Sequence, residues 1–558
     1  MSGFPLKAVT AVSAFSSYIL VGHFPGRLLF SRPSYLGTFI QLWVLSFLGW
    51  CFWRIILYPK WFSPLRYLPE PTGGSWWNGH FAQISALPSG APMIEWVNNI
   101  PNEGIIRYKA LFNSERIMIT SPKALGEVLV TRNYDFIKPN HFRSGLGRLL
   151  GIGILLAEGE EHKTQRKNLM PAFSFRHVKD LYPLFWEKSR EAVEAMTEQV
   201  KDGGIRNEDL PDFQKRPDVE NDDAVLEVGE WASRATLDII GVAGLGQDFG
   251  AIRDPNTVLN KTYRTVFKPS RQAAILGLLN LFLPMWFVSR LPIKRNGEIE
   301  AAAAVIRSTC RQLIRAKKDK LEKRELTDVD ILSVALESGG FSEENLIDQL
   351  MTFLAAGHET TATAMTWAVY MLCLNQDVQS RLRAEIRGNL PSLNESESVT
   401  SQQIDNMPYL QAVCSEVLRY YPPVPLTLRN AGVDTQILGH NIPKGTRVIF
   451  IPWAVNKSEE LWGPDARKFN PDRWLNNPNG GANSAYSLLT FLHGPRSCIG
   501  QRFATAEFAC LLAAWIGRFE FALNDERELD EKNVVIKGGV TARPAKGMYV
   551  KAKVLDGW

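Results

Sequence analysis

The 558-residue sequence predicts a mainly helical protein with small β-sheets, in which one folded domain follows an N-terminal membrane anchor. Two long runs carry the helical prediction. Apolar residues recur with helical spacing from Phe341 to Cys373, and a proline-free run follows Cys498. A charge-free run from Pro33 to Trp53 is long enough to cross a lipid bilayer, which predicts the anchor.

The composition is that of an ordinary globular protein, with 45% hydrophobic and 22% charged residues. The net charge of +5 is modest and no basic block stands out, so nothing indicates nucleic-acid binding. Six cysteines without a C-x-x-C pair argue against a disulfide framework or a zinc site, and they favour a reducing compartment.

Four segments are predicted along the chain. Residues 1–33 form an N-terminal segment with a possible additional membrane segment, and residues 34–58 form a transmembrane helix. Residues 59–74 are rich in proline and glycine, which predicts a stiff, turning hinge. Residues 75–558 form the folded domain.

Cations at the C-terminal end of the predicted span set its orientation. Arg54, Lys60 and Arg66 lie there, so by the positive-inside rule the folded domain faces the cytosol. Residues 8–22 are also uncharged but contain several hydroxyl side chains, and they could form a second span, an interfacial helix or the apolar part of a signal peptide. A cleaved signal peptide is disfavoured because a second hydrophobic run follows.

The segment 491–500, Phe-Leu-His-Gly-Pro-Arg-Ser-Cys-Ile-Gly, has a spacing that suits a haem-binding loop. Cys498 would be the thiolate ligand of the iron, and a helix starting there would lower its pKa. Gly494 permits a turn barred to other residues, and Gly500 lets the helix approach the porphyrin closely. Arg496 can pair with a haem propionate.

This segment resembles the haem-binding signature of the cytochrome P450 family, F-x-x-G-x-R-x-C-x-G, at every specified position, including Phe491. The resemblance extends over residues 69–550. It implies a cytochrome P450 fold with a single catalytic domain, and a haem (iron protoporphyrin IX) with an axial thiolate from Cys498. It also implies that residues 538–544 form paired strands that close the substrate pocket.

Ala356-Gly357-His358-Glu359-Thr360-Thr361 interrupts the long predicted helix with a glycine, at a cost of about 1 kcal/mol. Such an inconsistency suggests a groove where a distal ligand approaches the backbone. The stretch resembles the family pattern [A/G]-G-x-[D/E]-T-[T/S]. The resemblance implies that Thr360 steadies the bound oxygen and that Glu359 brings protons to it, whereas His358 is not expected to bind the haem.

The resemblance implies further candidates for binding the haem propionates. Arg166 and His162 align with the family's W-x-x-x-R helix, although histidine replaces the tryptophan. Either ring can donate to a propionate, but His162 could also titrate near neutral pH. Arg429 is a third candidate for pairing with the haem carboxylates.

The resemblance also predicts a structural network. Glu416 and Arg419 match the family's E-x-x-R helix, and Arg473 lies in a segment that resembles its P-x-R motif. Together these three residues are expected to form a buried network that locks the core around the Cys498 loop.

The leading functional hypothesis is a membrane-anchored haem-thiolate monooxygenase of the endoplasmic reticulum, which inserts one oxygen atom from O2 into an apolar small molecule by hydroxylation or epoxidation. The sequence contains no G-x-G-x-x-G after a predicted strand and no cysteine cluster for an iron–sulfur centre, so electrons from NADPH would come through a separate cytochrome P450 reductase. Residues 158–163 resemble fungal members, which favours specialised (secondary) metabolite biosynthesis.

Two alternatives stay open. The first is a haem-thiolate isomerase or dehydratase acting on an oxygenated lipid, which would not need the pair Glu359 and Thr360. The second is a non-catalytic haem sensor or carrier, which would need neither that pair nor a membrane anchor.

Overall fold

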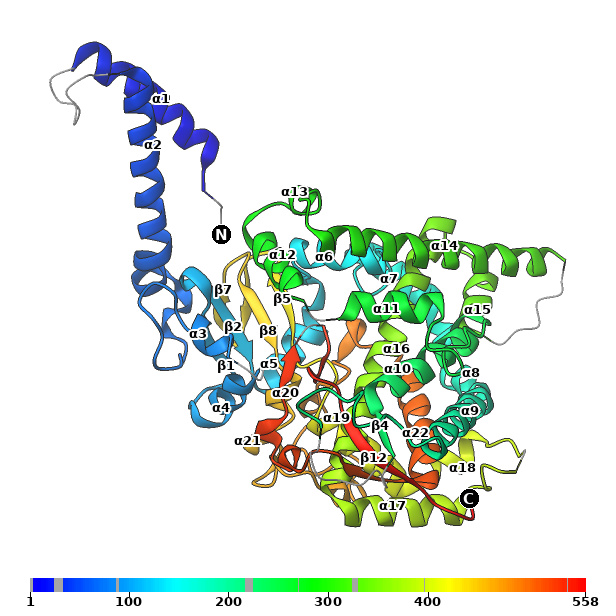
Figure 1. The fold of residues 1–558 in the computed structure, drawn as a ribbon. Coiled ribbons are helices and arrows are strands. Elements are labelled where there is room, and N and C mark those ends of the chain that lie inside the picture. The colour runs from blue at the N-terminus through cyan, green and yellow to red at the C-terminus, as the bar shows by residue number, and fades with distance from the viewer. Residues whose placement is uncertain are drawn as a thin grey trace.

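Helices account for 61% of the computed structural model, and the sheets are small, as predicted. The structure describes residues 4–24, 34–86, 90–215, 224–268, 270–323, 330–395, 397–538 and 540–558. Two N-terminal helices project from one side of the domain, and most of the remaining helices surround the long helix α16 (Figure 1).

The α-helices are α1 (Leu6–His23), α2 (Tyr35–Phe52), α3 (Phe81–Ile84), α4 (Ala91–Asn99), α5 (Pro122–Gly126), α6 (Asn140–Leu150), α7 (Gly159–Leu169), α8 (Phe175–Asp180), α9 (Tyr182–Lys201), α10 (Val228–Ile239), α11 (Val258–Phe267), α12 (Arg271–Phe282), α13 (Met285–Val288), α14 (Lys294–Glu322), α15 (Ile331–Glu337), α16 (Glu343–Leu374), α17 (Gln376–Asn389), α18 (Ser401–Asp405), α19 (Pro408–Tyr420), α20 (Pro452–Val455), α21 (Glu459–Trp462) and α22 (Gln501–Arg518).

The strands are β1 (Ile105–Lys109), β2 (Glu115–Ile119), β3 (Phe136–Ile137), β4 (Val225–Glu227), β5 (Thr427–Ala431), β6 (Thr435–Ile437), β7 (His440–Ile442), β8 (Arg447–Phe450), β9 (Phe519–Leu523), β10 (Ile536–Gly538), β11 (Ala542–Pro544) and β12 (Tyr549–Val554). One sheet has five strands in the order β1-β2-β8-β5-β3, and another has three in the order β4-β12-β9. The antiparallel pair β10–β11 confirms the strands predicted within residues 538–544, although Gly539 lies outside the described residues.

Helix α16 confirms the long helix predicted from Phe341 to Cys373. The Ser342 side chain caps its first turn by accepting a hydrogen bond from the N–H of Asn345. The helix contacts α10, α14, α19 and α22, so it lies inside the domain. Between Gln349 and Cys373 every residue is buried except Ala356, Gly357 and Thr360, which therefore mark the one open face of this helix.

The N-terminal apolar helix, which is a candidate membrane anchor, extends further than the sequence predicts. Helix α2 continues as a wider helical turn from Trp53 to Phe62, past Pro59, so the proline-rich segment predicted as a hinge over residues 59–74 begins later. The proline is tolerated because it removes only one N–H donor, and its carbonyl accepts a hydrogen bond from Arg107 Nη2 (2.6 Å). Arg107 lies on β1 and also pairs with Glu70 (2.9 Å) and Glu115 (2.8 Å). The base of the anchor is therefore docked on the five-stranded sheet.

The predicted network of Glu416, Arg419 and Arg473 is present and buried. Arg419 binds Glu416 through two nitrogens (2.7 and 2.8 Å), and Arg473 Nε lies 3.2 Å from Glu416 Oε1. Trp474 Nε1 donates a further hydrogen bond to Glu416 Oε2 (2.9 Å). One buried carboxylate is thus shared by two guanidinium groups and an indole.

Replacing this carboxylate should destabilise the domain strongly. Glu416→Ala leaves two buried cations without their counter-charge, so we expect the free energy of unfolding to fall by about 3–5 kcal/mol. Denaturation of the purified chain by urea measures the change. Asp472→Ala is the matched control, because its 2.7 Å pair with Arg381 is half exposed and contributes at most about 1 kcal/mol. Equal losses in the two variants would contradict this account.

Candidate active site

The Cys498 loop is closed by a hydrogen bond from the N–H of Cys498 to the carbonyl of Phe491 (2.9 Å). Gly494 has a φ of +76°, and a Cβ there would lie 2.2 Å from the carbonyl oxygen of Leu129, so both the turn and the close approach require glycine. Helix α22 begins at Gln501, three residues later than the start at Cys498 that the sequence predicts. The intervening residues form a turn.

The thiol of Cys498 is exposed, yet burial of its surroundings raises its pKa. The N–H of Gly500 and the guanidinium of Arg166 oppose this rise. The N–H of Gly500 at the start of the helix lowers the pKa of the thiol as predicted, but desolvation outweighs this contact and that of Arg166, so the net pKa is raised.

Arg166 holds the Cys498 loop in place through two hydrogen bonds. Its Nη1 donates to the carbonyl of Ser497 (2.7 Å), and its Nη2 donates to Ser497 Oγ (3.3 Å). Helix α7 is thereby attached to the residue next to Cys498, and a positive charge stands beside the thiol.

Three cations gather around a single carboxylate on another side of the loop. Arg496 Nη2 lies 2.5 Å from Glu158 Oε1, and Lys138 Nζ lies 3.5 Å from the same oxygen. Arg429 lies close enough to both Arg496 and Glu158 for their charges to affect its pKa. Burial, with repulsion from the neighbouring guanidinium groups, lowers the pKa of Lys138 to about 6 and that of Arg429 to about 9. The cluster has a formal surplus of two positive charges.

His162 lies beside this cluster and is buried. Its Nδ1 is 3.1 Å from the hydroxyl of Tyr134. Burial and the positive charges of Lys138 and Arg496 lower the pKa of His162 to about 4. The expectation that His162 titrates near neutral pH was therefore wrong, because the imidazole is already surrounded by cations and stays neutral at pH 7.

The open face of α16 carries Thr360, whose Oγ1 donates to the carbonyl of Ala356 (2.8 Å). Gly357 does not provide the predicted groove for a ligand, since a Cβ there would meet Ile240 at 2.9 Å. The glycine instead lets α16 pack closely against the turn that follows α10.

Glu359 points toward the C-terminal hairpin. Its Oε1 accepts a hydrogen bond from Thr541 Oγ1 (2.9 Å) and lies 3.4 Å from Arg543 Nη1. The hydroxyl and the acid predicted to act together are therefore adjacent in sequence but have different partners. His358 is fully buried with its Nδ1 2.5 Å from the carbonyl of Leu354.

The sequence of the whole domain matches known proteins. The family model described as Cytochrome P450 matches residues 69–550. Cytochrome P450 monooxygenase ALT8 of Alternaria alternata is 42% identical, covering 91% of this chain and 93% of its own length. Cytochrome P450 monooxygenase FUM15 of Gibberella moniliformis is 44% identical (90% of each chain), and sphH of Aspergillus fumigatus, another cytochrome P450 monooxygenase, is 45% identical (94% of this chain and 95% of its own).

The chain belongs to the cytochrome P450 family. It is an oxidoreductase of the monooxygenase type, and family membership implies a haem-thiolate cofactor. The residues present fit such a group. When Lys138 is protonated, the surplus of two positive charges matches the two negative charges of the haem propionates, and Arg496 Nε is buried without a hydrogen-bond partner. A Cβ at Gly500 would meet no protein atom closer than 3.8 Å, which leaves room for a porphyrin beside the loop.

In this cytochrome P450, Cys498 would hold the iron, and Lys138, Arg429 and Arg496 would hold the propionates. Sequence reasoning missed Lys138, as well as the two partners of Glu359, Thr541 and Arg543. No motif marks Lys138, because its proximity to Arg496 comes from segments far apart in the chain.

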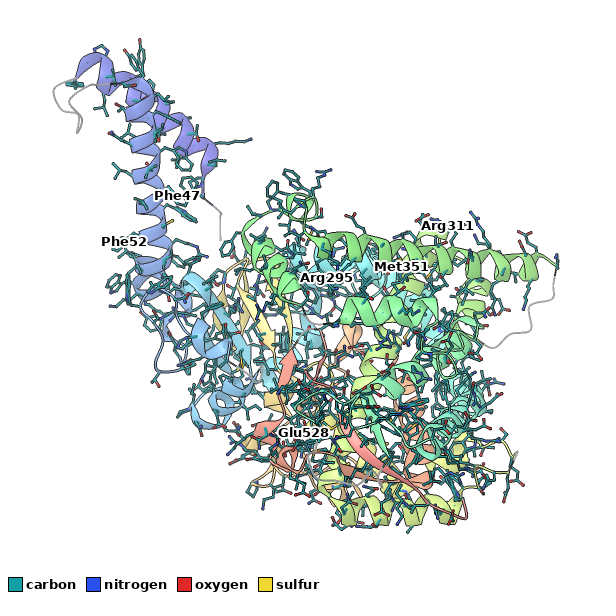
Figure 2. The ribbon with its side chains drawn as sticks, in the orientation of Figure 1. Phe47, Phe52, Arg295, Arg311, Met351 and Glu528 are labelled. Atoms are coloured by element: carbon teal, nitrogen blue, oxygen red, sulfur yellow. The ribbon has the colours of Figure 1, made fainter. Side chains whose placement is uncertain are left out.

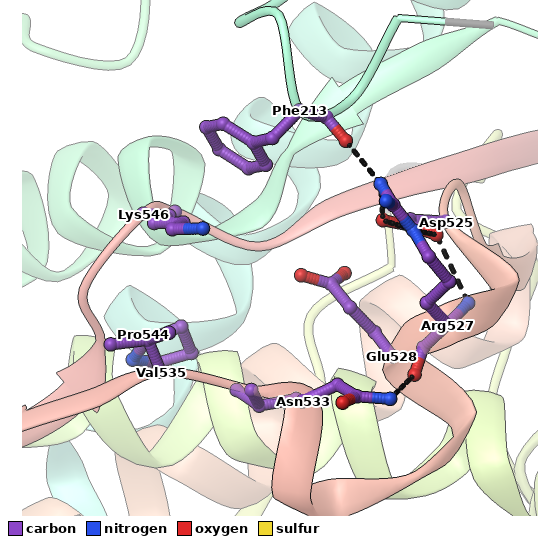
Figure 3. Close-up of a pocket in the computed structure, with 10 residues that line it drawn as sticks. Phe213, Asp525, Arg527, Glu528, Asn533, Val535, Pro544 and Lys546 are labelled. Carbon is purple, nitrogen blue, oxygen red and sulfur yellow. Dashed lines mark hydrogen bonds and ion pairs between the residues drawn. The ribbon is translucent and has the colours of Figure 1, made fainter. Parts of the chain in front are cut away.

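A separate cleft of about 250 Å³ lies beyond the C-terminal hairpin (Figure 3). Its lining includes Phe213, Glu528 and Lys546, and the pair of Asp525 and Arg527 (2.7 Å) closes one side. No predicted site residue lines this cleft, so it is distinct from the haem site.

Replacing Lys138 should have opposite effects on the haem-free and haem-bound chain. At pH 7 the folded haem-free chain gives up most of the Lys138 proton that the unfolded chain keeps, which disfavours folding. Lys138→Met should therefore not lower the free energy of unfolding of the haem-free chain. It should raise the rate of haem loss about ten-fold, since one charge-assisted contact to a propionate is missing.

Transfer of haem to excess apomyoglobin, followed by absorbance, measures that rate. Lys163→Met is the control, because the Lys163 side chain is half exposed and pairs with Glu160. Unchanged haem retention in Lys138→Met would contradict the assignment of Lys138 to the propionates.

Proposed function

We propose that the chain is a membrane-anchored monooxygenase that inserts one oxygen atom from O2 into an apolar small molecule, by hydroxylation or epoxidation. NADPH supplies the electrons through a separate cytochrome P450 reductase. The anchor holds the enzyme at the endoplasmic reticulum with its catalytic domain in the cytosol. The fungal sources of the relatives favour a role in specialised metabolite biosynthesis.

One observation carries this proposal: Thr360 lies at the open face that α16 has between Gln349 and Cys373, next in sequence to the buried acid Glu359, in a domain whose single exposed thiol is Cys498 among the cysteines of the described residues. When bound, the haem supplies the iron at which dioxygen is reduced. An isomerase or a haem carrier has no use for a proton-delivering pair on the oxygen side.

At this open face, the hydroxyl oxygen of Thr360 can accept a hydrogen bond from a bound molecule. Because its own proton is donated to the carbonyl of Ala356, its lone pairs remain available. The hydroxyl can thus orient a water molecule or a protonated group next to the place where oxygen reacts. The bond to Ala356 also holds the side chain in one rotamer.

Glu359 is held by the elements that cover the substrate side. Thr541 and Arg543 lie on the C-terminal hairpin, and Arg543 Nη2 also donates to the carbonyl of Phe267, the last residue of α11 (3.4 Å). Arg543 therefore connects the acid to two segments far apart in sequence. A shift of either segment on substrate binding would change how tightly the acid is held, so we assign Arg543 as a positioning residue.

Labelled oxygen tests the reaction. Microsomes containing the full chain and a reductase, given NADPH, 18O2 and a panel of terpenoids, polyketides and fatty acids, should form a product that gains one 18O atom. Cys498→Ala should lose both this product and the carbon-monoxide difference band. A product without 18O, formed without NADPH, would indicate an isomerase or dehydratase instead.

Loss of Arg543 should uncouple NADPH consumption from product formation. In Arg543→Gln the acid loses its cationic partner, so we expect product per NADPH to fall about ten-fold and the pH profile of turnover to shift. Arg543→Lys should retain most of the coupling because it keeps the charge. Arg527→Gln, in the separate cleft, is the control and should behave as the unaltered chain. A profile that does not shift in Arg543→Gln would rule out the positioning role.

A further inference from the structure

Helices α1 and α2 form an antiparallel pair that projects from the domain (Figure 1). Their contact surface combines aromatic packing of Phe4 against Trp43 and Trp50 with a stripe of buried hydroxyl side chains. Trp43 Nε1 on α2 donates to Thr10 Oγ1 on α1 (3.2 Å), and Ser13 and Ser17 of α1 are only 2% and 5% exposed. Thr38 of α2 is also buried. Since these positions on α1 are three and four residues apart, they form one stripe along its inner face.

The outer faces of the two helices are apolar. On α1, Val12, Phe15 and Tyr18 are 64%, 67% and 64% exposed. On α2, an exposed stripe recurs at every fourth residue: Leu36, Ile40, Val44 and Leu48. Phe47 and Phe52 also lie on this helix, outside the folded domain (Figure 2). A stripe of hydroxyl residues inside and apolar residues outside is the reverse of what a helix pair in water shows.

This distribution also argues against α1 as a helix lying on the membrane surface. An interfacial helix keeps a polar face in water and an apolar face in lipid. The hydroxyl side chains of α1 face α2 instead, and its exposed side is apolar. Small and hydroxyl residues at the contact, with a hydrogen bond between the helices, are typical of transmembrane helix pairs.

We propose that α1 and α2 cross the membrane as a helical hairpin, so that Leu6 lies on the same cytosolic side as the catalytic domain. The proposal rests on the membrane anchoring proposed above and adds a second crossing to it. The partner is the hydrocarbon interior of a lipid bilayer, which the apolar outer faces of both helices would contact.

The dimensions agree with two crossings. Each helix has 18 residues and is about 27 Å long, close to the thickness of the hydrocarbon core. Among the described residues, the stretch from Tyr35 to Phe62 is the single one apolar enough to pass as a span on its own. The hydroxyl residues lower the hydropathy of α1, and in the pair they are shielded by α2.

The charges agree with the orientation. Phe4 packs against Trp50 (ring centroids 5.4 Å apart), which places the start of α1 beside the end of α2. Lys7 and Arg54 therefore flank the same end of the hairpin. Cations at this end, including those after Arg54, outnumber Arg27 and Arg32 in the connecting sequence, as the positive-inside rule requires.

Glycosylation reporters test the second crossing in the full chain. A polar extension carrying an Asn-x-Thr acceptor is placed ahead of residue 1 in one protein, and between Phe24 and Ser34 in another. Expressed with eukaryotic microsomes, the acceptor in the connecting sequence should be glycosylated and the N-terminal one should not. Glycosylation of the N-terminal acceptor, alone or with the other, would overturn the hairpin.

Resistance to alkaline extraction separates this result from a failure of anchoring itself. If neither acceptor is glycosylated and the protein is extracted at high pH, the chain does not cross the membrane, and both proposals fall. A matched pair of variants adds a control. Phe15→Arg places a charge on the lipid-facing side of α1, so this helix should cross less often and the N-terminal acceptor should become glycosylated, whereas Phe15→Leu should leave that acceptor unglycosylated. Equal glycosylation in both variants would show that this face does not contact lipid.

Discussion

The buried carboxylate of Glu416 is the interaction on which the site depends. Its partner Arg419 also donates to the carbonyl of Asn456 (2.7 Å), and the Asn456 side chain holds the segment that leads into the Cys498 loop. Asn456 Oδ1 accepts the N–H of Leu489 (2.8 Å), and its Nδ2 donates to Thr490 Oγ1 (3.0 Å). A fully buried ion pair contributes little net stability, but it leaves few alternative arrangements. The position of the thiol follows from that arrangement.

Beside the Cys498 loop, buried positive charges outnumber the negative charge of their single carboxylate partner. A bound anion would balance them. Lys138, Arg429 and Arg496 surround one carboxylate, and burial makes each positive charge costly. The folded chain keeps this cluster because the end of β3, β5 and the Cys498 loop place the three cations there together. We infer that the stability of the domain and the retention of haem are coupled through these three side chains.

The acid of α16 and the helix pair α1–α2 share one feature: each depends on partners distant in the sequence. Glu359 is positioned by the C-terminal hairpin and, through Arg543, by the end of α11. Helix α1 presents its hydroxyl groups to α2. In both cases a polar group that would be unfavourable alone becomes acceptable because another element satisfies it.

The sequence alone determined the fold family, the long helix through Thr360 and the members of the Glu416 network, because each depends on motifs whose residue types stand at fixed spacings, and a motif of the same kind marks Cys498 as the candidate thiolate. It determined neither the pKa of Cys498 nor that of His162, since these depend on desolvation and on charges from other segments. The docking of the predicted hinge on Arg107, the packing of Ile240 against Gly357 and the presence of Lys138 in the cation cluster were decided only by tertiary structure. Contacts between segments hundreds of residues apart leave no local pattern, and burial itself is a property of the folded chain.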